Sequence, residues 1–465
     1  MRRTLLIALA LLTGPAWSAD VTLPDYERIE LDNGTVLLLS EKHDVPLVGM
    51  RAMVRGGSAT DPKGLAGLAD LLATVMQKGA GKRDAAGFAE AVAGVGGSLS
   101  ASANLEAISV SAEFLSRDVE LMIELVADML LRPTLSEEEF EKERDRSIAL
   151  IQAAKGSDPS RLMPAYANAF IFGNHAYGNP SGGSEATLAE LSHEDIKQYY
   201  EDFFGGDRLI IAVVGDFDLE AMKAKLTSVF GGWEPAAAKS PVLAAPALIA
   251  APRVLLVDKP GATQTYFWIG NIGVAVDYPR RAELDLANTV FGGRFTSMLM
   301  TALRVEGGLT YSARSALERY AETGTVTIRS FTETSTTIEA IDLAISTLDR
   351  LHIKGLNNEL ITSARNYIMG QFPPTLETAS SLARMLAFLE QNGLDRRYVD
   401  EYGAALHEAT PVTISNTIAE VYPTADDLVF VLIGDASAIR DDVAKYGPVT
   451  EISITEPRFR PQSPK

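Results

Sequence analysis

The sequence DRLIIAVVGD at residues 207–216 returns as DDLVFVLIGD at residues 426–435, and this recurrence decides the fold. Each copy contains an uninterrupted apolar run that is followed by Gly-Asp, a pattern typical of a buried strand followed by a turn. A second pair, VLLLSEK at 36–42 and VLLVDKP at 254–260, recurs in the same order. The two pairs have nearly the same offset in numbering, from 207 to 426 and from 36 to 254. Two ordered matches at nearly one offset predict two diverged copies of one domain.

Helical patterns lie between the predicted strands. Apolar side chains recur at helical spacing in 65–75 and again in 119–130. Ser136, with Glu139 three positions later, predicts a capping box that begins a third helix, which runs through Ile148. Strands mixed with long helical insertions favour an α+β fold, in which each domain packs a mixed or antiparallel sheet against several helices.

Composition shifts divide the chain into segments. The predicted domains are 20–235 and 253–455, and the Ala- and Pro-rich segment 236–252 is the predicted linker between them. The prolines of 456–465 predict an extended, poorly ordered tail.

Residues 1–19 predict a secretory signal peptide. Two arginines precede an apolar run at 5–12, and small residues follow up to Ser18 and Ala19, where we expect cleavage. A retained membrane anchor is the alternative. The later apolar stretch 242–257 is interrupted by prolines, so no membrane span is expected in the mature chain. These features predict an exported protein, in the periplasm of a cell with two membranes.

Charge and cysteine content narrow the classes of partner. The formal charge is −19 at pH 7, and nucleic acid is not expected as a partner because phosphate binding needs a basic surface. An acidic surface suits basic peptides, but it equally serves solubility. The sequence contains no cysteine, so it offers neither a disulfide nor a thiol for a lipid anchor.

The stretch GLAGLADLL at residues 64–72 carries a family resemblance. It resembles the insulinase and pitrilysin type of zinc peptidase, in which a Gly-Leu-Ala lead-in is followed by the inverted motif H-x-x-E-H. The resemblance implies that Gly67 and Leu71 stand at the two histidine positions. It also implies that Asp70 stands at the position of the general-base glutamate.

A later segment, EKERDRSIAL at residues 141–150, is similar to the family's second metal-binding helix. In the family the third ligand lies seven positions after a supporting glutamate. The resemblance implies that Glu143 is the supporting glutamate and that Leu150 stands at the ligand position. Glycine and leucine side chains donate no electron pair, so all three ligands are missing and we expect no metal or other cofactor in this chain.

Other routes to chemistry are also missing from the sequence. There is no Ser in a G-x-S-x-G context and no complete phosphate loop, so we assign no catalytic residue. A metal site assembled from distant segments is the alternative. We expect the histidines to be surface or capped side chains, because no two of them have helical ligand spacing: His43, His175, His193, His352 and His407.

The segment GNHAYGNP at residues 173–180 is similar to the family's H-P-Y-G segment. On a purely structural interpretation, His175 and Tyr177 pack a turn beneath the predicted strand 209–216.

The second half carries the strongest retained signal. FGGRFTSML at 291–299 and LRVEGGLTYS at 303–312 are similar to the family's G-G-x-x-S-x-L and R-x-x-x-G-L-x-Y segments. The resemblance implies that Arg304 and Tyr311 line the substrate groove and hydrogen-bond the peptide backbone. The alternative is structural: the arginine pairs with Glu306 or caps a helix, and the tyrosine fills the core.

The resemblance implies a non-catalytic subunit of a two-chain zinc peptidase, in which two chains of this size close as a clamshell around a chamber. The expected partner is a zinc-bearing homologous subunit, in a heterodimer or larger assembly, and the expected substrate is a short or unfolded peptide. A catalytically inactive peptide-binding or scaffold protein of the cell envelope, as a homodimer, is the alternative.

Overall fold

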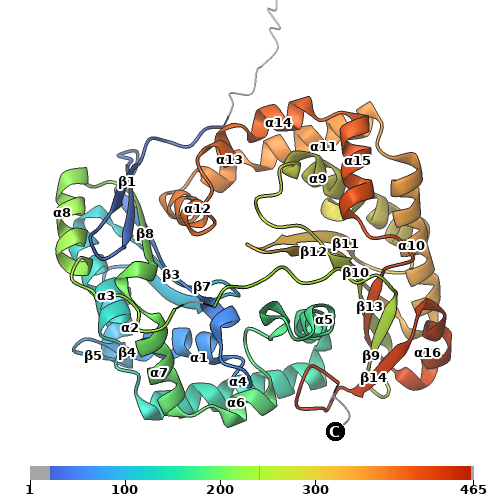
Figure 1. Cartoon of the computed structure of the whole chain (residues 1–465), viewed down its shortest axis with the longest axis horizontal. Coiled ribbons are helices and arrows are strands. Elements are labelled where there is room, and N and C mark those ends of the chain that lie inside the picture. Colours follow the sequence, from blue (N-terminus) through green and yellow to red (C-terminus); the bar gives the residue numbers. More distant parts are fainter. Residues whose placement is uncertain (1–20, 240, 462–465) are drawn as a thin grey trace, which may run out of the picture.

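A computed structural model describes residues 21–239 and 241–461, which form two six-stranded sheets on opposite sides of the molecule (Figure 1). The first sheet has the order β1 (Glu27–Glu30), β2 (Val36–Glu41), β8 (Leu209–Gly215), β3 (Leu47–Arg55), β7 (Ala107–Leu115) and β6 (Ser98–Ala103). The second has the order β11 (Ala313–Arg319), β12 (Gly324–Glu333), β10 (Gln264–Ile272), β13 (Val429–Gly434), β9 (Arg253–Asp258) and β14 (Val449–Ser453). Each sheet mixes parallel and antiparallel pairs, so the predicted α+β fold with two homologous domains is confirmed.

The repeat is visible in backbone hydrogen bonds. The Lys42 N–H donates to the carbonyl of Gly215, and the Lys259 N–H donates to the carbonyl of Gly434, both at 2.8 Å. These bonds make Lys42 equivalent to Lys259, whereas the sequence comparison aligned it with Pro260, so the predicted alignment of the first strands is wrong by one position. The strands are almost wholly buried and apolar, and such a run has no alternation of polar and apolar residues to fix the alignment.

The predicted helices of the first half form as α1 (Leu68–Val75), α3 (Val119–Leu131) and α4 (Glu137–Ser157). Ser136 is the N-cap of α4, but its side chain makes no capping hydrogen bond, so the predicted capping box is wrong. Glu139 instead bonds to Lys142 at 3.3 Å. Three consecutive acidic residues in the first turn complement the positive end of the helix dipole, which accounts for a helix start without the box.

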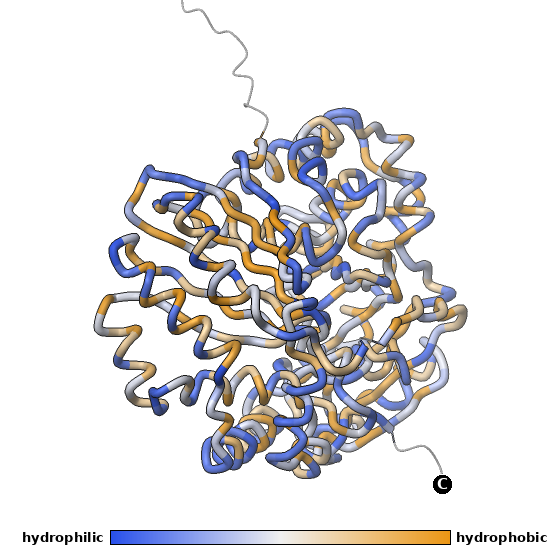
Figure 2. Tube along the Cα trace, turned by 60° about the vertical axis from the view of Figure 1, so that its left-hand side comes forward, coloured by the Kyte–Doolittle hydropathy of each residue, from blue (hydrophilic) through white to orange (hydrophobic). Residues whose placement is uncertain are grey.

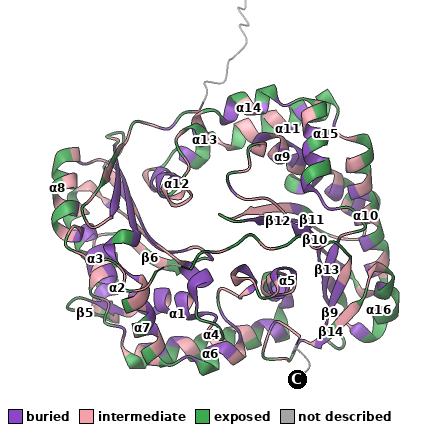
Figure 3. Cartoon of the chain, viewed as in Figure 1, coloured by how far each residue is buried: buried purple, intermediate pink, exposed green. Residues whose placement is uncertain are grey.

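Each sheet has one face covered by helices of its own half and the other face covered by a helix of the opposite half (Figures 1 and 3). Helix α12 (Ala379–Gln391) packs on β3 and β8 of the first sheet, where Leu382 and Leu386 join the same core as Leu38. Helix α5 (Met163–Phe172) packs on β10 and β13 of the second sheet. The starts of α5 and α12 differ in numbering by nearly the offset of the strands, so the exchange is itself part of the repeat.

The exchanged helix α12 approaches the first sheet closely at Gly49. A Cβ added there would lie 2.6 Å from the backbone nitrogen of Ser380, so the close approach of the helix to β3 requires glycine. Figure 2 shows the resulting distribution of hydropathy, with apolar segments along the strands in the interior and hydrophilic segments in the loops outside.

The remaining helices of the first half are α2 (Ala85–Ala93), α6 (Glu185–Glu190), α7 (His193–Phe203) and α8 (Leu219–Phe230). Those of the second half are α9 (Arg281–Asn288), α10 (Thr337–Lys354), α11 (Asn358–Gln371), α13 (Arg397–Asp400), α14 (Tyr402–Glu408), α15 (Pro411–Val421) and α16 (Ala436–Val443).

The C-terminal tail differs from expectation. Phe459 is 4% exposed and packs edge-on against Tyr166 at a ring separation of 4.8 Å, and the carbonyl of Pro457 accepts from the Ala186 N–H at 3.1 Å. The predicted poorly ordered tail is therefore wrong for 456–461, because an aromatic anchor offsets the entropy of ordering the segment. Residues 462–465 and the predicted signal peptide 1–19 lie outside the described residues.

Within 21–239 and 241–461, no helix has the length and apolar character to cross a membrane.

Candidate peptide-binding site and degenerate metal site

Gly67, at the first histidine position, is the N-cap of α1 with a left-handed backbone, φ 100°. A Cβ added there would lie 2.7 Å from the Cα of Gly183, a separation that real side chains do not tolerate. An imidazole at this position would therefore meet both a strained backbone and a neighbouring chain segment. The site has lost the room for the ligand as well as the ligand itself.

The other motif positions lie in environments that differ from one another. Leu71 is 2% exposed in the core of the first half, whereas Leu150 on α4 is 56% exposed. Asp70 lies half-buried on α1, and burial raises the pKa of its carboxyl. Within the described part of the chain, no three His, Cys, Asp or Glu side chains come together in a group that could hold a metal ion. The residues present do not fit zinc.

Glu143, the supporting glutamate of the resemblance, is 3% exposed on α4. Its carboxylate lies 2.9 Å from the Lys78 ammonium, in the turn after α1, and 3.4 Å from the Arg146 guanidinium. A buried carboxylate needs such partners. Glu143 thus joins the turn after α1 to α4 through its ion pair with Lys78.

Asp61 fixes the start of α1. Its two carboxyl oxygens accept from the backbone N–H groups of Gly67 and Ala69, at 2.8 and 2.9 Å. Burial of this side chain outweighs those hydrogen bonds and raises the pKa of Asp61 to about 8. The carboxyl holds the irregular backbone that leads into the degenerate motif.

The pH dependence of stability should report Asp61. The unfolded side chain has a pKa of about 3.9, so between about pH 4 and pH 8 the folded chain holds a proton that the unfolded chain has released. The contribution of this group to the free energy of unfolding is complete below about pH 4 and falls as the pH rises to about 8. Urea denaturation of wild type and Asp61→Asn across this window measures it, and parallel curves would contradict the assignment.

Four of the five histidines contact a carboxylate or a backbone carbonyl. His43 lies 2.7 Å from the Asp216 carboxylate, and three others reach backbone carbonyls: His175 to Ala244, His193 to Leu135 and His352 to Pro423.

Tyr177 lies between the two halves and not beneath β8, which corrects the structural interpretation of its segment. Its hydroxyl donates to the Glu106 carboxylate at 2.5 Å, and the same carboxylate accepts from the Ala321 N–H at 2.8 Å. The Tyr177 ring packs edge-on against Tyr320 at 5.2 Å. The segment therefore joins the first half to the second sheet.

Arg304 and Tyr311 are brought together in the second half. Arg304 lies in the π-helical turn Met300–Glu306, and its guanidinium carbon is 4.4 Å from the centroid of the Tyr311 ring. Tyr311 is 72% exposed, which rules out the alternative that it fills the core. Among the described residues no ion pair joins Arg304 to Glu306. The arginine is held by stacking, with the edge donors of its guanidinium available to a ligand.

Phe295 completes this cluster and was missed from the sequence. Its ring, 66% exposed, lies 4.9 Å from the guanidinium carbon of Arg304. The Gly292-Gly293 pair just before it was the available signal. A Cβ at Gly292 would lie 2.2 Å from the backbone nitrogen of Ser315, so glycine lets the π-helical turn Thr289–Gly293 lie against β11. We call Phe295, Arg304 and Tyr311 the Arg304 cluster.

Two pockets adjoin the Arg304 cluster. One of about 330 Å³ is lined by Tyr311 itself together with Leu309, Phe331 and neighbouring residues. The other, of about 620 Å³, shares Phe331 and adds Tyr266, Arg314 and Arg329. A bound peptide needs hydrogen-bonding partners for its main chain and concave, partly aromatic surfaces for its side chains. Arg304 and Tyr311 offer the first, and the two pockets offer the second.

Comparison with known proteins identifies the family of the chain. The family model described as "Insulinase (Peptidase family M16)" matches residues 36–183, and that of the "Peptidase M16 inactive domain" matches residues 190–368. The chain is 25% identical over 355 residues to a Bacillus subtilis protein named "Uncharacterized zinc protease YmxG", covering 76% of this chain and 85% of that one. It is 24% identical over 352 residues to a Helicobacter pylori protein named "Non-peptidase homolog YmxG", covering 74% and 79%.

Solved structures share the fold. The crystal structure of a peptidase M16 inactive domain from Pseudomonas fluorescens superposes with a TM-score of 0.82 at 20% identity, covering 88% of this chain and 98% of that one. That of a Helicobacter pylori protease gives the same TM-score at 18% identity, covering 88% and 100%. The chain belongs to the insulinase family, peptidase family M16.

Proposed function

We propose that this chain is the non-catalytic subunit of an exported zinc metallopeptidase complex, in which it holds the peptide while a zinc-bearing homologous subunit cleaves it. The observation that carries the proposal is the Arg304 cluster: a half-buried arginine stacked on an exposed tyrosine, in a chain whose three metal-ligand positions hold glycine and leucine. Arg304 and Tyr311 offer N–H and O–H donors to the carbonyl oxygens of a bound peptide. Zinc in the partner would supply the activated water.

The contribution of this chain would be positional. Holding a peptide in register can lower a reaction barrier by as much as roughly 7 to 11 kcal/mol. The two pockets beside the cluster would take side chains on either side of the held backbone. A chamber closed between two chains of this size excludes folded proteins, so the substrate is a short or unfolded peptide. The signal peptide predicted at residues 1–19 supports a periplasmic location for the complex.

The test is to purify the chain alone and together with a co-expressed partner that carries H-x-x-E-H. We expect peptide cleavage from the complex only, and its loss on adding a metal chelator. Chelator-resistant cleavage by the lone chain would contradict the division of labour. So would a failure of the two chains to associate at micromolar concentration, when the native mass of the assembly is measured.

Phe295 should act as a positioning residue for Arg304. Phe295→Ala removes one of the two rings over which the guanidinium lies, a contact worth about 0.5–1 kcal/mol at an exposed site. We expect a two- to fivefold lower kcat/KM of the complex, about the factor that this energy gives. Phe295→Tyr should restore the rate because it keeps the ring. Equal losses in both variants would mean that Arg304 does not depend on this stacking.

A second candidate is a peptide-binding or scaffold protein of the cell envelope, as a homodimer. The edge strand β6 favours it, since β7 is its only neighbouring strand and its other side has backbone groups for an added strand, apart from the Ala101 carbonyl, which accepts from the Gln77 side chain. A neighbouring reading frame with H-x-x-E-H and a later Glu favours the peptidase complex. Its absence, with a native mass of two identical chains, favours the scaffold.

A further inference from the structure

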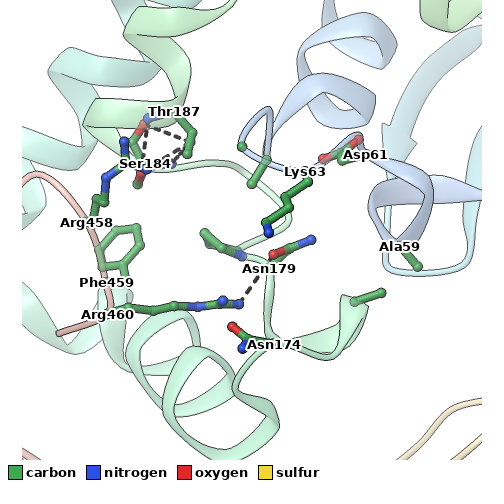
Figure 4. Close-up of a pocket in the computed structure, with 14 residues that line it drawn as sticks. Ala59, Asp61, Lys63, Asn174, Asn179, Ser184, Thr187, Arg458, Phe459 and Arg460 are labelled. Carbon is green, nitrogen blue, oxygen red and sulfur yellow. Dashed lines mark hydrogen bonds between the residues drawn. The ribbon is translucent and has the colours of Figure 1, made fainter. Parts of the chain in front are cut away.

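A pocket of about 530 Å³ lies away from the Arg304 cluster, where three segments of the chain meet (Figure 4). The segments are the loop that leads into α1, the loop that follows α5, and the C-terminal tail. No residue is shared with the Arg304 cluster or with its two adjoining pockets.

The lining of this pocket is basic, in a chain whose formal charge is −19. Lys63, Arg458 and Arg460 contribute cations, and Asp61 is the single acidic residue among the described residues that line it. Both oxygens of Asp61 are taken up by backbone N–H groups at the start of α1. The pocket therefore presents an excess of positive charge that its own acid does not neutralise.

Two of these cations lack a carboxylate partner within the described ranges. The Arg460 guanidinium contacts the side-chain oxygen of Asn179, a neutral amide, at 3.3 Å, and burial lowers its pKa. Figure 4 shows the Lys63 ammonium and the Arg460 guanidinium both directed toward Asn179. By contrast, Arg458 pairs with Glu190 at 3.1 Å. Partial burial of a guanidinium without a counter-charge is costly, and an anion between the two cations would remove the cost.

We infer that this pocket binds an oxyanion, a carboxylate or a phosphate, between Lys63 and Arg460. The guanidinium presents paired N–H donors that match two oxygens of either group, and the ammonium supplies a second charge. The amides of Asn174 and Asn179 line the same space and can donate to a further oxygen. The tail is the element that completes the site, since it brings Arg460 from the end of the chain to loops of the first half.

Calorimetric titration of the full chain tests the inference with three probes: inorganic phosphate, an acetylated tripeptide with a free C-terminal carboxylate, and the same tripeptide as its amide. We expect saturable one-site binding of phosphate or of the free carboxylate, and none of the amide. Phosphate alone would identify a phosphate site, and the carboxylate alone a site for peptide ends. Lys63→Gln with Arg460→Gln should weaken the binding about tenfold or more, as expected for losing a charge-assisted hydrogen bond.

Arg117→Gln is the matched control, because this side chain is 76% exposed, pairs with Asp118 and lies outside the pocket. It should bind the probe as the wild type does. If Arg460→Gln unfolds the chain, Lys63→Gln alone decides, since Lys63 is exposed. Absence of saturable binding by both phosphate and the free carboxylate overturns the inference. So does equal affinity in the wild type and the pocket variant.

Discussion

Gly67→Ala is expected to lower the free energy of unfolding by about 2–5 kcal/mol. The left-handed backbone at this position costs a side chain roughly 1–2 kcal/mol, and overpacking against Gly183 adds about 1–3 kcal/mol. Urea denaturation at fixed pH, with the slope checked for two-state behaviour, measures the loss.

Gly64 provides a matched control for the same loop. It also has a positive φ, 93°, but a Cβ there would have nothing within 4 Å. Gly64→Ala should therefore lose only the conformational part, about 1–2 kcal/mol. Equal losses at Gly64 and Gly67 would show that the contact with Gly183 contributes nothing.

The lack of space at Gly67 should prevent the metal site from being restored by substitution. A variant with Gly67→His, Leu71→His and Leu150→Glu carries all three ligands, yet we expect no tight Zn²⁺ binding because the first imidazole has no room. Leu150→Glu alone should be nearly neutral to stability, since Leu150 is exposed. A folded triple variant that holds one Zn²⁺ per chain would contradict the closure of this site.

Sequence reasoning reached β2, β8, β9 and β13, together with the helices α1, α3 and α4, because their signals are local. The apolar runs 209–214 and 428–433 can be little other than buried strands, and the repeat set their order. The alignment of the first strands was wrong by one position because a run buried on both faces has no alternation. Ser136 was correct as the start of α4 and wrong as a capping box, since the acidic first turn suffices.

What the sequence did not predict are the non-local contacts. An amphipathic or apolar helix must cover some sheet, but nothing in residues 163–172 or 379–391 says that the sheet belongs to the other half. Phe459 looked like part of a Pro-rich end because its partner, Tyr166, lies in the first half of the chain. Likewise, the sequence shows at Gly67 that a ligand is missing. It does not show that Gly183 fills the space that a side chain would need there, because that contact joins distant segments of the chain.

In the candidate site, too, the sequence predicted the motif residues but not the contacts between them. The Arg304 and Tyr311 positions followed from a resemblance over short motifs, and the structure adds their stacking. Phe295 lies within the same segment, 291–299, yet its exposure could not be known, because an apolar side chain in a sequence predicts burial.

Arg304→Ala with Tyr311→Phe is expected to lower the kcat/KM of the two-chain complex by about 10²–10⁴. Each variant loses a hydrogen bond in which a group is charged or becomes charged in the reaction, and such a bond is worth about 1.5–3 kcal/mol. Stability should change little, because Tyr311 is 72% exposed and the guanidinium is held by aromatic faces and not by buried ion pairs. Thermal unfolding of each variant and the native mass of the complex are the controls.

The single variant Arg304→Lys separates the charge of the arginine from its geometry. Arg304→Lys keeps the cation but loses the planar fork, so its rate should lie nearer to Arg304→Ala than to the wild type. Because the guanidinium lies on the Tyr311 ring, the losses in Arg304→Ala and in Tyr311→Ala, which removes that ring, should not add, and a double-mutant cycle of these two variants should give a coupling of about 0.5 kcal/mol or more. A full rate in Arg304→Lys would reduce the role of the arginine to its charge. An unchanged rate in the double variant, with the complex intact, would mean that the peptide is held by other residues and that the Arg304 cluster is not the binding site.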